Sequence, residues 1–391
     1  MENVQSVQWS QGGQPHSARW RSERGAPPPQ RVVIADDTTT AYHAYGLACQ
    51  GTALLWNGDF QNARQMLIAL ANRAERPARK PKRGVALPVV DVPLGGPAMA
   101  AAFHRHRLSR SQRARMLGML LVELDADYGI ALRRAPDLRQ ACHEAYGPAG
   151  DRSVVSLREL LGVVGAHEWR SKGIDVPAAG GRIHPHYGVF APVRREYVDL
   201  VADAPLPAAA AATSVAFDIG TGTGVLAAVL ARRGFARVIA TDQDPRALAC
   251  ARANIEQLGL TDNVEIVAAD LFPEGRAALV LCNPPWVPAR PSSPLEFGIY
   301  DPESRMLRAF LAGLAVHLVP EGEGWLILSD IAEHLGLRTR TELMAAIEAA
   351  ALRVVDRTDV RPTHPKAVDA TDALHAARAA EVTSLWRLAA R

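Results

Sequence analysis

The tetrapeptide Asn283-Pro284-Pro285-Trp286 is the stretch of this chain best suited to chemistry. It follows the apolar run 279–282, which favours a buried strand, and two consecutive prolines end such a strand because they cannot donate to a sheet ladder. The Asn283 side-chain oxygen and the Pro284 carbonyl can accept hydrogen bonds from the N–H groups of an amide or a base amine. The prolines would hold this corner in one shape, and Trp286 would stack on the planar group, contributing about 1–3 kcal/mol if that group is a nucleic-acid base.

A glycine turn and two aspartates point to a nucleoside-like ligand. The turn, Asp218–Gly224, has the spacing GxGxG, whereas a dinucleotide site favours GxGxxG. The shorter turn after an acidic residue suits a cofactor without phosphates. Asp242 ends the next expected strand and can accept both hydroxyls of a ribose, and Asp270 ends the third and can accept from an adenine amine. Ligands of parallel sheets bind at the carboxyl ends of the strands, so these residues are expected at one edge.

Strand-like and helical segments alternate from about residue 214 to the C-terminus. This alternation predicts an α/β fold with a mostly parallel sheet covered by helices on both faces. Asp244 and Pro245 are typical of a helix start, and Gly234 and Gly259 of helix ends. The last two strands have no helical segment between them, so we expect them to pair as an antiparallel edge hairpin.

Four segments, FDIGTGTG, ATDQD, AADLF and CNPPW, occur in an order that resembles a known family. The chain is similar over roughly residues 183–391 to the class I S-adenosylmethionine-dependent methyltransferases, in the amino-methylating group with the motif (Asn/Asp)-Pro-Pro-aromatic. It looks most like the branch that contains release-factor glutamine methyltransferases and small-domain ribosomal RNA guanine methyltransferases. The resemblance implies a Rossmann-like, seven-stranded domain with S-adenosylmethionine as cofactor.

The resemblance also implies roles for individual residues. Asp218 would orient the amino group of the cofactor, Asp242 would hold its ribose and Asp270 its adenine. The glycine turn would cradle the methionine portion, and the further cofactor-binding residues would be Gly220, Thr221, Gly222, Gly224, Leu271, Phe190 and Pro192. Phe190 and Pro192 belong to an aromatic and proline segment that closes over the cofactor in relatives.

Two features bear on the acceptor side of the site. Relatives that methylate glutamine read Pro-Arg-Pro-Glu-Thr in the closing segment, whereas this chain reads Ala-Pro-Val-Arg-Arg-Glu over residues 191–196, which weakens a release-factor assignment. The segment 296–311 follows the Asn-Pro-Pro-Trp motif. It is predicted either to form a lid with Tyr300 and Asp301 near the substrate or to be a plain connector.

The first 180 residues predict a different kind of region. Residues 1–35 are rich in Gln, Ser, Gly, Pro and Arg and are expected to be disordered, and residues 36–180 are expected to be a mainly helical substrate-recognition domain before the methyltransferase domain at 181–391. The window 73–115 carries eleven Lys and Arg residues against Glu75 and Asp91. Such a window can neutralise RNA phosphates, or it can be a solvated face or linker.

These observations predict an S-adenosylmethionine-dependent N-methyltransferase that acts on a planar amine or amide nitrogen. An exocyclic amine of an RNA base is the first expectation, because of the basic window. A protein glutamine side chain or a small-molecule amide or amine is the alternative. A third hypothesis is a non-catalytic, cofactor-binding RNA or assembly factor.

Composition limits the class of protein. The 391 residues are 48% hydrophobic and 22% charged with a net charge of +3, which is typical of a soluble globular protein. No apolar run reaches the roughly 18–20 residues of a membrane span, so a cytoplasmic location without membrane contact is expected. Four scattered cysteines and the pairs His104/His106 and His184/His186 lack the spacing of ligands, and no metal is expected.

Overall fold

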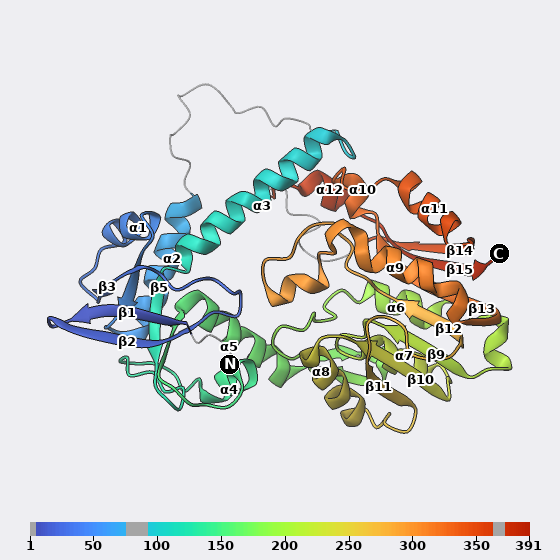
Figure 1. Ribbon diagram of the computed structural model, residues 1–391, viewed down its shortest axis with the longest axis horizontal. Coiled ribbons are helices and arrows are strands. Elements are labelled where there is room, and N and C mark those ends of the chain that lie inside the picture. Colours follow the sequence, from blue (N-terminus) through green and yellow to red (C-terminus); the bar gives the residue numbers. More distant parts are fainter. Residues whose placement is uncertain (1–4, 76–92, 363–371) are drawn as a thin grey trace. The chain divides into compact units, whose positions relative to one another are not determined.

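The computed structural model describes residues 5–75, 93–362 and 372–391 (Figure 1). The chain divides into two compact units: unit 1 comprises residues 1–91 and 105–168, and unit 2 comprises residues 92–104 and 169–391. The division therefore lies at residue 168, near the expected boundary at 180. In addition, unit 2 contains a short segment from the N-terminal half of the sequence.

Unit 1 is built on a six-stranded sheet with the order β1-β2-β6-β5-β4-β3. Its strands are β1 (Ser6–Gln11), β2 (Gln14–Arg21), β3 (Arg31–Ala35), β4 (Thr52–Trp56), β5 (Leu120–Leu124) and β6 (Ser153–Ser156). Its helices are α1 (Ala41–Cys49), α2 (Phe60–Glu75), α4 (Arg139–Tyr146), α5 (Leu157–Lys172, which runs on into unit 2) and the second half of α3 (Pro97–Leu117). Helices are the commoner element between residues 36 and 180, as expected, but the expectation did not include the sheet that forms the centre of this unit.

The expectation of disorder before residue 36 is also wrong for the described residues. Strands β1 and β2 form an antiparallel hairpin in which Gln11 pairs with Gln14. The two loop residues, Gly12 and Gly13, have φ values of 58° and 77°, as a tight hairpin turn requires. Val7 and Trp9 are buried on one side of β1. The alternation and the Gly-Gly turn were present in the sequence, but the polar composition around them concealed the signal.

Unit 2 contains a seven-stranded sheet with the order β11-β10-β9-β12-β13-β15-β14. Its strands are β9 (Val215–Ile219), β10 (Arg237–Asp242), β11 (Val264–Ala268), β12 (Ala277–Cys282), β13 (Leu318–Ser329), β14 (Leu352–Val360) and β15 (Thr383–Ala390), and a separate two-stranded sheet pairs β7 (Ile174–Val176) with β8 (Gly181–Ile183). The first five strands run parallel, whereas β15 is antiparallel to both β13 and β14. The predicted Rossmann-like sheet is therefore confirmed, and β14 and β15 pair antiparallel at its edge as expected. They do not form the expected hairpin, because helix α12 (His375–Ala380) lies between them in the sequence.

Helices cover both faces of this sheet (Figure 1). They are α6 (Glu196–Asp203), α7 (Val225–Arg232), α8 (Pro245–Gln257), α9 (Arg305–Leu314) and α11 (Arg340–Ala349). Unit 2 also contains α10 (Ile331–His334) and α12 (His375–Ala380), whose buried residues belong to a separate cluster. Leu279 and Leu281 of β12 pack with α6, α7 and α8, whereas Val280 and Cys282 pack with α9 and α11 on the other face. A strand buried on both faces explains the continuous apolar run before Asn283.

The first half of α3 belongs to unit 2. Met99 and Phe103 are buried with Val287, Ile331 and Leu335 in one hydrophobic cluster. Much of the predicted basic window, residues 76–92, lies outside the described residues. Within the described parts of the chain, every helix is too short or too polar to cross a lipid bilayer.

Candidate functional site

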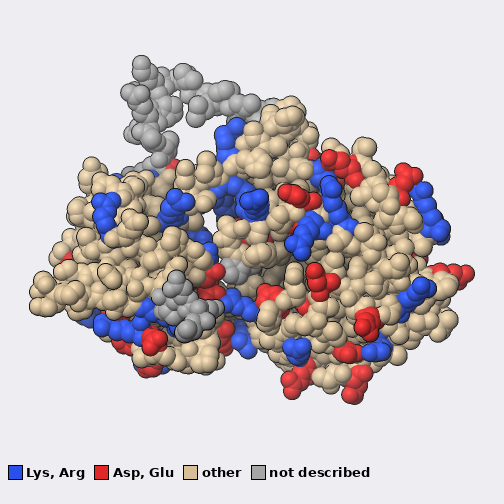
Figure 2. All heavy atoms as spheres, in the orientation of Figure 1, with Lys and Arg blue, Asp and Glu red and all other residues tan. Residues whose placement is uncertain are grey.

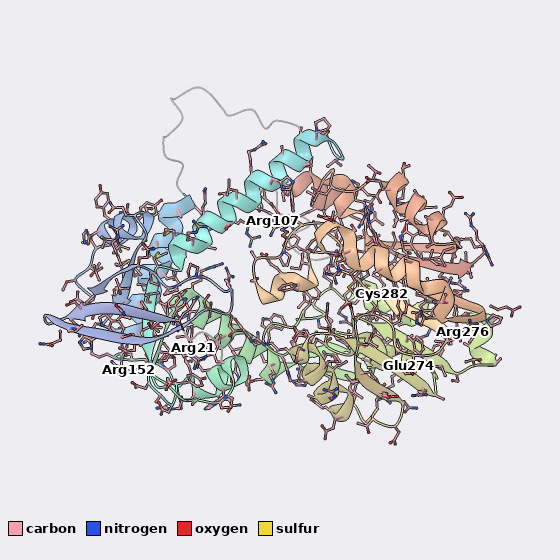
Figure 3. All side chains as sticks on the ribbon, viewed as in Figure 1. Arg21, Arg107, Arg152, Glu274, Arg276 and Cys282 are labelled. Atoms are coloured by element: carbon pink, nitrogen blue, oxygen red, sulfur yellow. The ribbon has the colours of Figure 1, made fainter. Side chains whose placement is uncertain are left out.

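The glycine turn and the Asn-Pro-Pro-Trp motif begin at neighbouring strand ends. Strands β9 and β12 are parallel, and Ile219 pairs with Cys282, which Figure 3 labels at the end of β12. Gly220 and Asn283 therefore follow two paired residues, on strands that lie about 4.8 Å apart. The chain passes from β9 to β10 and β11 on one side and to β12 on the other, so this is the point where the strand order reverses. Such a point is where α/β sheets bind ligands.

Two glycines of the turn are required for different structural reasons. Gly222 has a φ of +56°, donates its N–H to Asp242 Oδ2 at 3.0 Å, and has no atom within 4 Å of the position that a Cβ would occupy. Gly224 has a φ of +80° at the start of α7, where a Cβ would lie 3.3 Å from the backbone of Ala251 in α8. Gly222 thus leaves open space beside the turn, and Gly224 permits close helix packing.

Asp218 lies buried at the end of β9. Its Oδ2 accepts a hydrogen bond of 2.6 Å from the Thr221 hydroxyl. Burial raises the pKa of Asp218 to about 6, although the Thr221 hydroxyl and the Ala227 N–H partly offset this effect. No cation pairs with Asp218 among the described residues. A buried carboxylate of this kind can bind an ammonium group.

Asp242 and Asp270 differ in exposure. Asp242 is half-buried at the end of β10 and accepts from the N–H groups of Gly222 and Asp244, both at 3.0 Å; burial raises its pKa. Asp270 lies two residues beyond β11 and is exposed. The Leu271 carbonyl accepts from the Thr241 hydroxyl at 2.5 Å, which ties the end of β11 to β10. The predicted cofactor residues of three adjacent strands thus meet at one sheet edge.

The closing segment approaches the residues after the motif. Pro192 is buried and Phe190 is half-buried. The Phe190 side chain packs against Gly298, where an added Cβ would lie 2.7 Å from the Phe190 Cβ. The contacts of Phe190 therefore join the closing segment to the stretch that leads to Tyr300.

The side chains of the Asn-Pro-Pro-Trp motif bond to one another. The indole N–H of Trp286 donates to Asn283 Oδ1 at 2.9 Å. The Arg194 guanidinium lies 4.8 Å from the centre of the Trp286 ring. Arg194 in turn donates to Glu196 at 2.8 Å and to Glu381 at 3.0 Å. The Pro284 carbonyl accepts no hydrogen bond from the described residues.

Sequence reasoning missed Arg194 and Glu381 as residues of this site. Arg194 belongs to the closing segment where this chain departs from its relatives, which was a usable signal. Glu381 lies far beyond the motif, between α12 and β15, and nothing in the sequence around it indicated a contact with Arg194.

The segment after the motif is ordered by a buried carboxylate. Asp301 accepts from the N–H groups of Met306 at 3.0 Å and Leu307 at 3.2 Å, so it caps α9, and burial raises its pKa. The Met306 methyl group lies 2.6 Å from the position that a Cβ of Gly220 would occupy. Tyr300 forms a bridge with Val287, next to Trp286. The segment therefore brings Met306 to the glycine turn and Tyr300 to the motif.

Part of the chain, including this site, is similar to known proteins. Residues 181–351 match the family called Methyltransferase small domain. The matched residues all lie in unit 2. The match begins at β8 and ends just before β14, so it includes the glycine turn and the Asn-Pro-Pro-Trp motif.

Several curated proteins are similar to part of this chain. The chain is 37% identical over 146 residues to the ribosomal protein L11 methyltransferase of Pelotomaculum thermopropionicum, which is 37% of this chain and 39% of that protein. It is 40% identical over 111 residues to the release factor glutamine methyltransferase of Cereibacter sphaeroides, which is 27% of this chain and 36% of that protein. It is 28% identical over 202 residues to the release factor glutamine methyltransferase of Gloeobacter violaceus, which is 48% of this chain and 67% of that protein. The chain thus spans less than two fifths of the length of the first two relatives. All three names refer to protein substrates, so the comparisons do not support the first expectation of an RNA base.

Proposed function

We propose that this protein is an S-adenosylmethionine-dependent methyltransferase that acts on the nitrogen of a planar amide or amine. The observation that carries this proposal is the pairing of Ile219 with Cys282, because it sets the glycine turn beside the acceptor groups of Asn283 and Pro284. When bound, S-adenosylmethionine supplies an electrophilic methyl group on a sulfonium.

The residues at the sheet edge fit this cofactor. Asp218 is a buried carboxylate without a cationic partner among the described residues, and the cofactor carries an ammonium group. Asp242 stands at the end of β10, where it can accept ribose hydroxyls, and Asp270 can accept from the adenine amine. The open space beside Gly222 would admit the methionine portion. The turn lacks the longer glycine spacing that a pyrophosphate requires.

The motif residues would bind and orient the methyl acceptor. The nitrogen of an amide or an exocyclic amine is a weak nucleophile, because its lone pair is delocalised. Asn283 Oδ1 and the Pro284 carbonyl would accept its N–H bonds and aim the nitrogen at the methyl group, which gains rate chiefly by orientation. The N–H bond that becomes acidic during transfer points to these acceptors, and the proton then leaves to water.

A protein side-chain amide or amine is the acceptor class that we favour. The relatives named above are methyltransferases of ribosomal protein L11 and of release factor glutamine. An amide side chain is planar and carries two N–H bonds, which matches the two acceptors of the motif.

A group of arginines in unit 1 supports an RNA base as the second candidate. The Arg158 guanidinium has no ion-pair partner among the described residues, and burial lowers its pKa to about 10. Arg24, Arg110 and Arg113 lower this pKa further and Glu159 partly offsets them, while Arg113 is itself paired with Glu75. Arg110 and Arg113 lie on α3, and Figure 2 shows Lys and Arg side chains in the region of this helix. Guanidinium groups that repel one another are stabilised by phosphate.

Transfer of a labelled methyl group tests the proposed function and separates the two candidates. We would incubate the protein with S-adenosylmethionine carrying a tritiated methyl group and an extract of cells that lack the gene. The label is expected in protease-sensitive material and absent with Asn283→Ala, for which Asn263→Ala in a distant loop is the matched control. Label in RNA would favour the second candidate, and no label in either would contradict the proposal.

The RNA candidate has its own test in salt dependence. If Arg110 and Arg158 contact phosphates, replacing both by Ala should weaken RNA binding at 50 mM salt. The slope of log K against the logarithm of the salt concentration should become shallower by about two, because two phosphate contacts are lost. Arg276→Ala in unit 2 is the control. Binding that is indifferent to salt between 50 and 300 mM would exclude the RNA candidate.

A further inference from the structure

The Asn283 amide can adopt two orientations, and the site must select one of them. An asparagine side chain has an accepting end, Oδ1, and a donating end, Nδ2, which have nearly the same shape. The proposed function, on which this inference rests, requires Oδ1 to face the N–H of the methyl acceptor. A rotation of the amide by half a turn would present Nδ2 instead, and two N–H groups would then oppose each other.

The indole N–H of Trp286 selects one of these two orientations. Among the described residues it is the one hydrogen-bond partner of the Asn283 side chain, at 2.9 Å from Oδ1. An indole N–H can only donate, so it can bond only to the oxygen end of the amide. Because a carbonyl oxygen has two lone pairs, Oδ1 keeps one for the methyl acceptor.

Trp286 is itself held by a buried ion-pair group. Arg194 lies 4.8 Å from the centre of the ring and covers one of its faces. The side chains of Arg194, Glu196 and Glu381 are 16%, 7% and 4% exposed, so both ion pairs are largely shielded from water. Glu381 also accepts from the Ser329 hydroxyl at 2.7 Å, which anchors the group to the end of β13. Rotation of the ring would break a cation–π contact that is supported on two sides.

We propose that Trp286 is a positioning residue that acts through Asn283: its indole N–H fixes the Asn283 amide with Oδ1 as the acceptor, and Arg194, held by Glu196 and Glu381, fixes the indole. This role differs from the sequence-based expectation that Trp286 serves by stacking on the substrate. One ring face is already taken by Arg194, so a stacked acceptor would have only the opposite face. In this role Trp286 acts through its Nε1–H, and the rest of the ring holds that group in place against Arg194.

An isostere without the N–H separates this role from stacking and packing. We would replace Trp286 by benzothienylalanine, which has sulfur in place of the indole N–H, and make the same replacement at the exposed Trp169 as the matched control. The assay measures the initial rate of tritium transfer from saturating S-adenosylmethionine to the extract of cells that lack the gene. We expect the rate to fall about 10- to 100-fold at position 286, with cofactor affinity within about threefold of wild type, and no change at position 169.

Combining replacements at positions 283 and 286 gives a second test. Its result would not change if Trp286 served only to pack the site. An aspartate at position 283 offers oxygen at both ends, so its orientation no longer matters. The loss caused by Trp286→Phe should therefore be much smaller in the Asn283→Asp background than in the wild-type background, which a double-mutant cycle measures. In the resting protein, the Trp286 indole proton should also exchange slowly with solvent, and it should exchange faster in Asn283→Ala.

The outcomes distinguish this inference from the function on which it rests. If wild type transfers the methyl group and the isostere at position 286 is equally fast or faster, the positioning role is wrong and the proposed function stands. If wild type binds the cofactor and transfers nothing, the proposed function fails. In that case a Trp286 indole proton that exchanges as fast as an exposed one would overturn the hydrogen bond as well.

Discussion

At the scale of single residues, burial of the Asp218 carboxylate lowers the stability of the fold at neutral pH, and the same carboxylate is proposed to bind the cofactor. Its folded-state pKa of about 6 is above the usual value of 3.8 because the carboxylate is buried. Between these two values the folded protein binds more protons than the unfolded chain, so the stability contributed by this group is greatest at low pH and falls as pH rises towards 6. The ionised carboxylate therefore destabilises the cofactor-free protein at neutral pH.

Asp218→Asn should consequently separate stability from binding. The variant is expected to be more stable than wild type at pH 7.5, by roughly 1–3 kcal/mol, because the neutral amide removes the cost of burying a charge. It should also lose measurable affinity for S-adenosylmethionine, because the amide cannot pair with an ammonium group. Urea unfolding at pH 5 and 7.5 and titration calorimetry measure the two effects, with the exposed Asp262→Asn as control. A variant that binds the cofactor normally would contradict the role of Asp218.

The sequence predicted which residue types stand at this sheet edge but not how they bond to one another. Asp218, Asp242 and Asn283 were found because each ends a strand of a recognisable pattern. The bond from Trp286 to Asn283 and the ion pairs of Arg194 depend on side-chain directions. No spacing in the sequence encodes these directions, because the partners come from separate elements.

At the scale of elements, the glycine turn gives a paired prediction. Gly224→Ala should lower the free energy of unfolding by about 1–3 kcal/mol, because a left-handed residue would meet the α8 backbone. Gly222→Ala should cost only about 1–2 kcal/mol, because its Cβ points into open space. The same Cβ should weaken cofactor binding by about tenfold or more, since it would occupy the space for the methionine portion. Equal cofactor affinity in Gly222→Ala and wild type would show that the cofactor does not contact this turn.

Elements were easiest to predict where periodicity and end signals agreed. The alternation after about residue 214 gave the sheet of unit 2, and Asp244 does cap α8 through the Arg246 N–H at 2.9 Å. In unit 1, by contrast, the mostly apolar run Leu120–Leu124 forms the largely buried strand β5 shortly after α3. A short apolar run after a helix fits a longer helix or a strand equally well, and the tertiary pairing with β4 and β6 decides between them.

At the scale of the whole molecule, unit 2 is discontinuous in sequence. Residues 92–104 belong to unit 2, and Phe103 is buried against Val287, which directly follows the Asn-Pro-Pro-Trp motif. A boundary drawn from the sequence near residue 180 misses this segment, because nothing local marks it as part of a distant domain.

Phe103→Ala should therefore destabilise unit 2. We expect a loss of about 3–5 kcal/mol in the free energy of unfolding, because a buried aromatic side chain is replaced by a cavity. Leu108 on the same helix is 59% exposed, so Leu108→Ala should have almost no effect. Urea unfolding followed by tryptophan fluorescence measures both variants. An unchanged midpoint for Phe103→Ala would show that unit 2 does not depend on this segment.

The most direct test of the central claim compares methylated products in cells. Peptides and nucleosides from cells with the gene, without it, and with the Asn283→Ala variant would be analysed by mass spectrometry. We predict that one N-methylated species, 14 Da heavier than its precursor, disappears on deletion, returns with the wild-type gene and does not return with Asn283→Ala. Restoration by Asn283→Ala, or a methyl group on an atom other than nitrogen, would contradict the account.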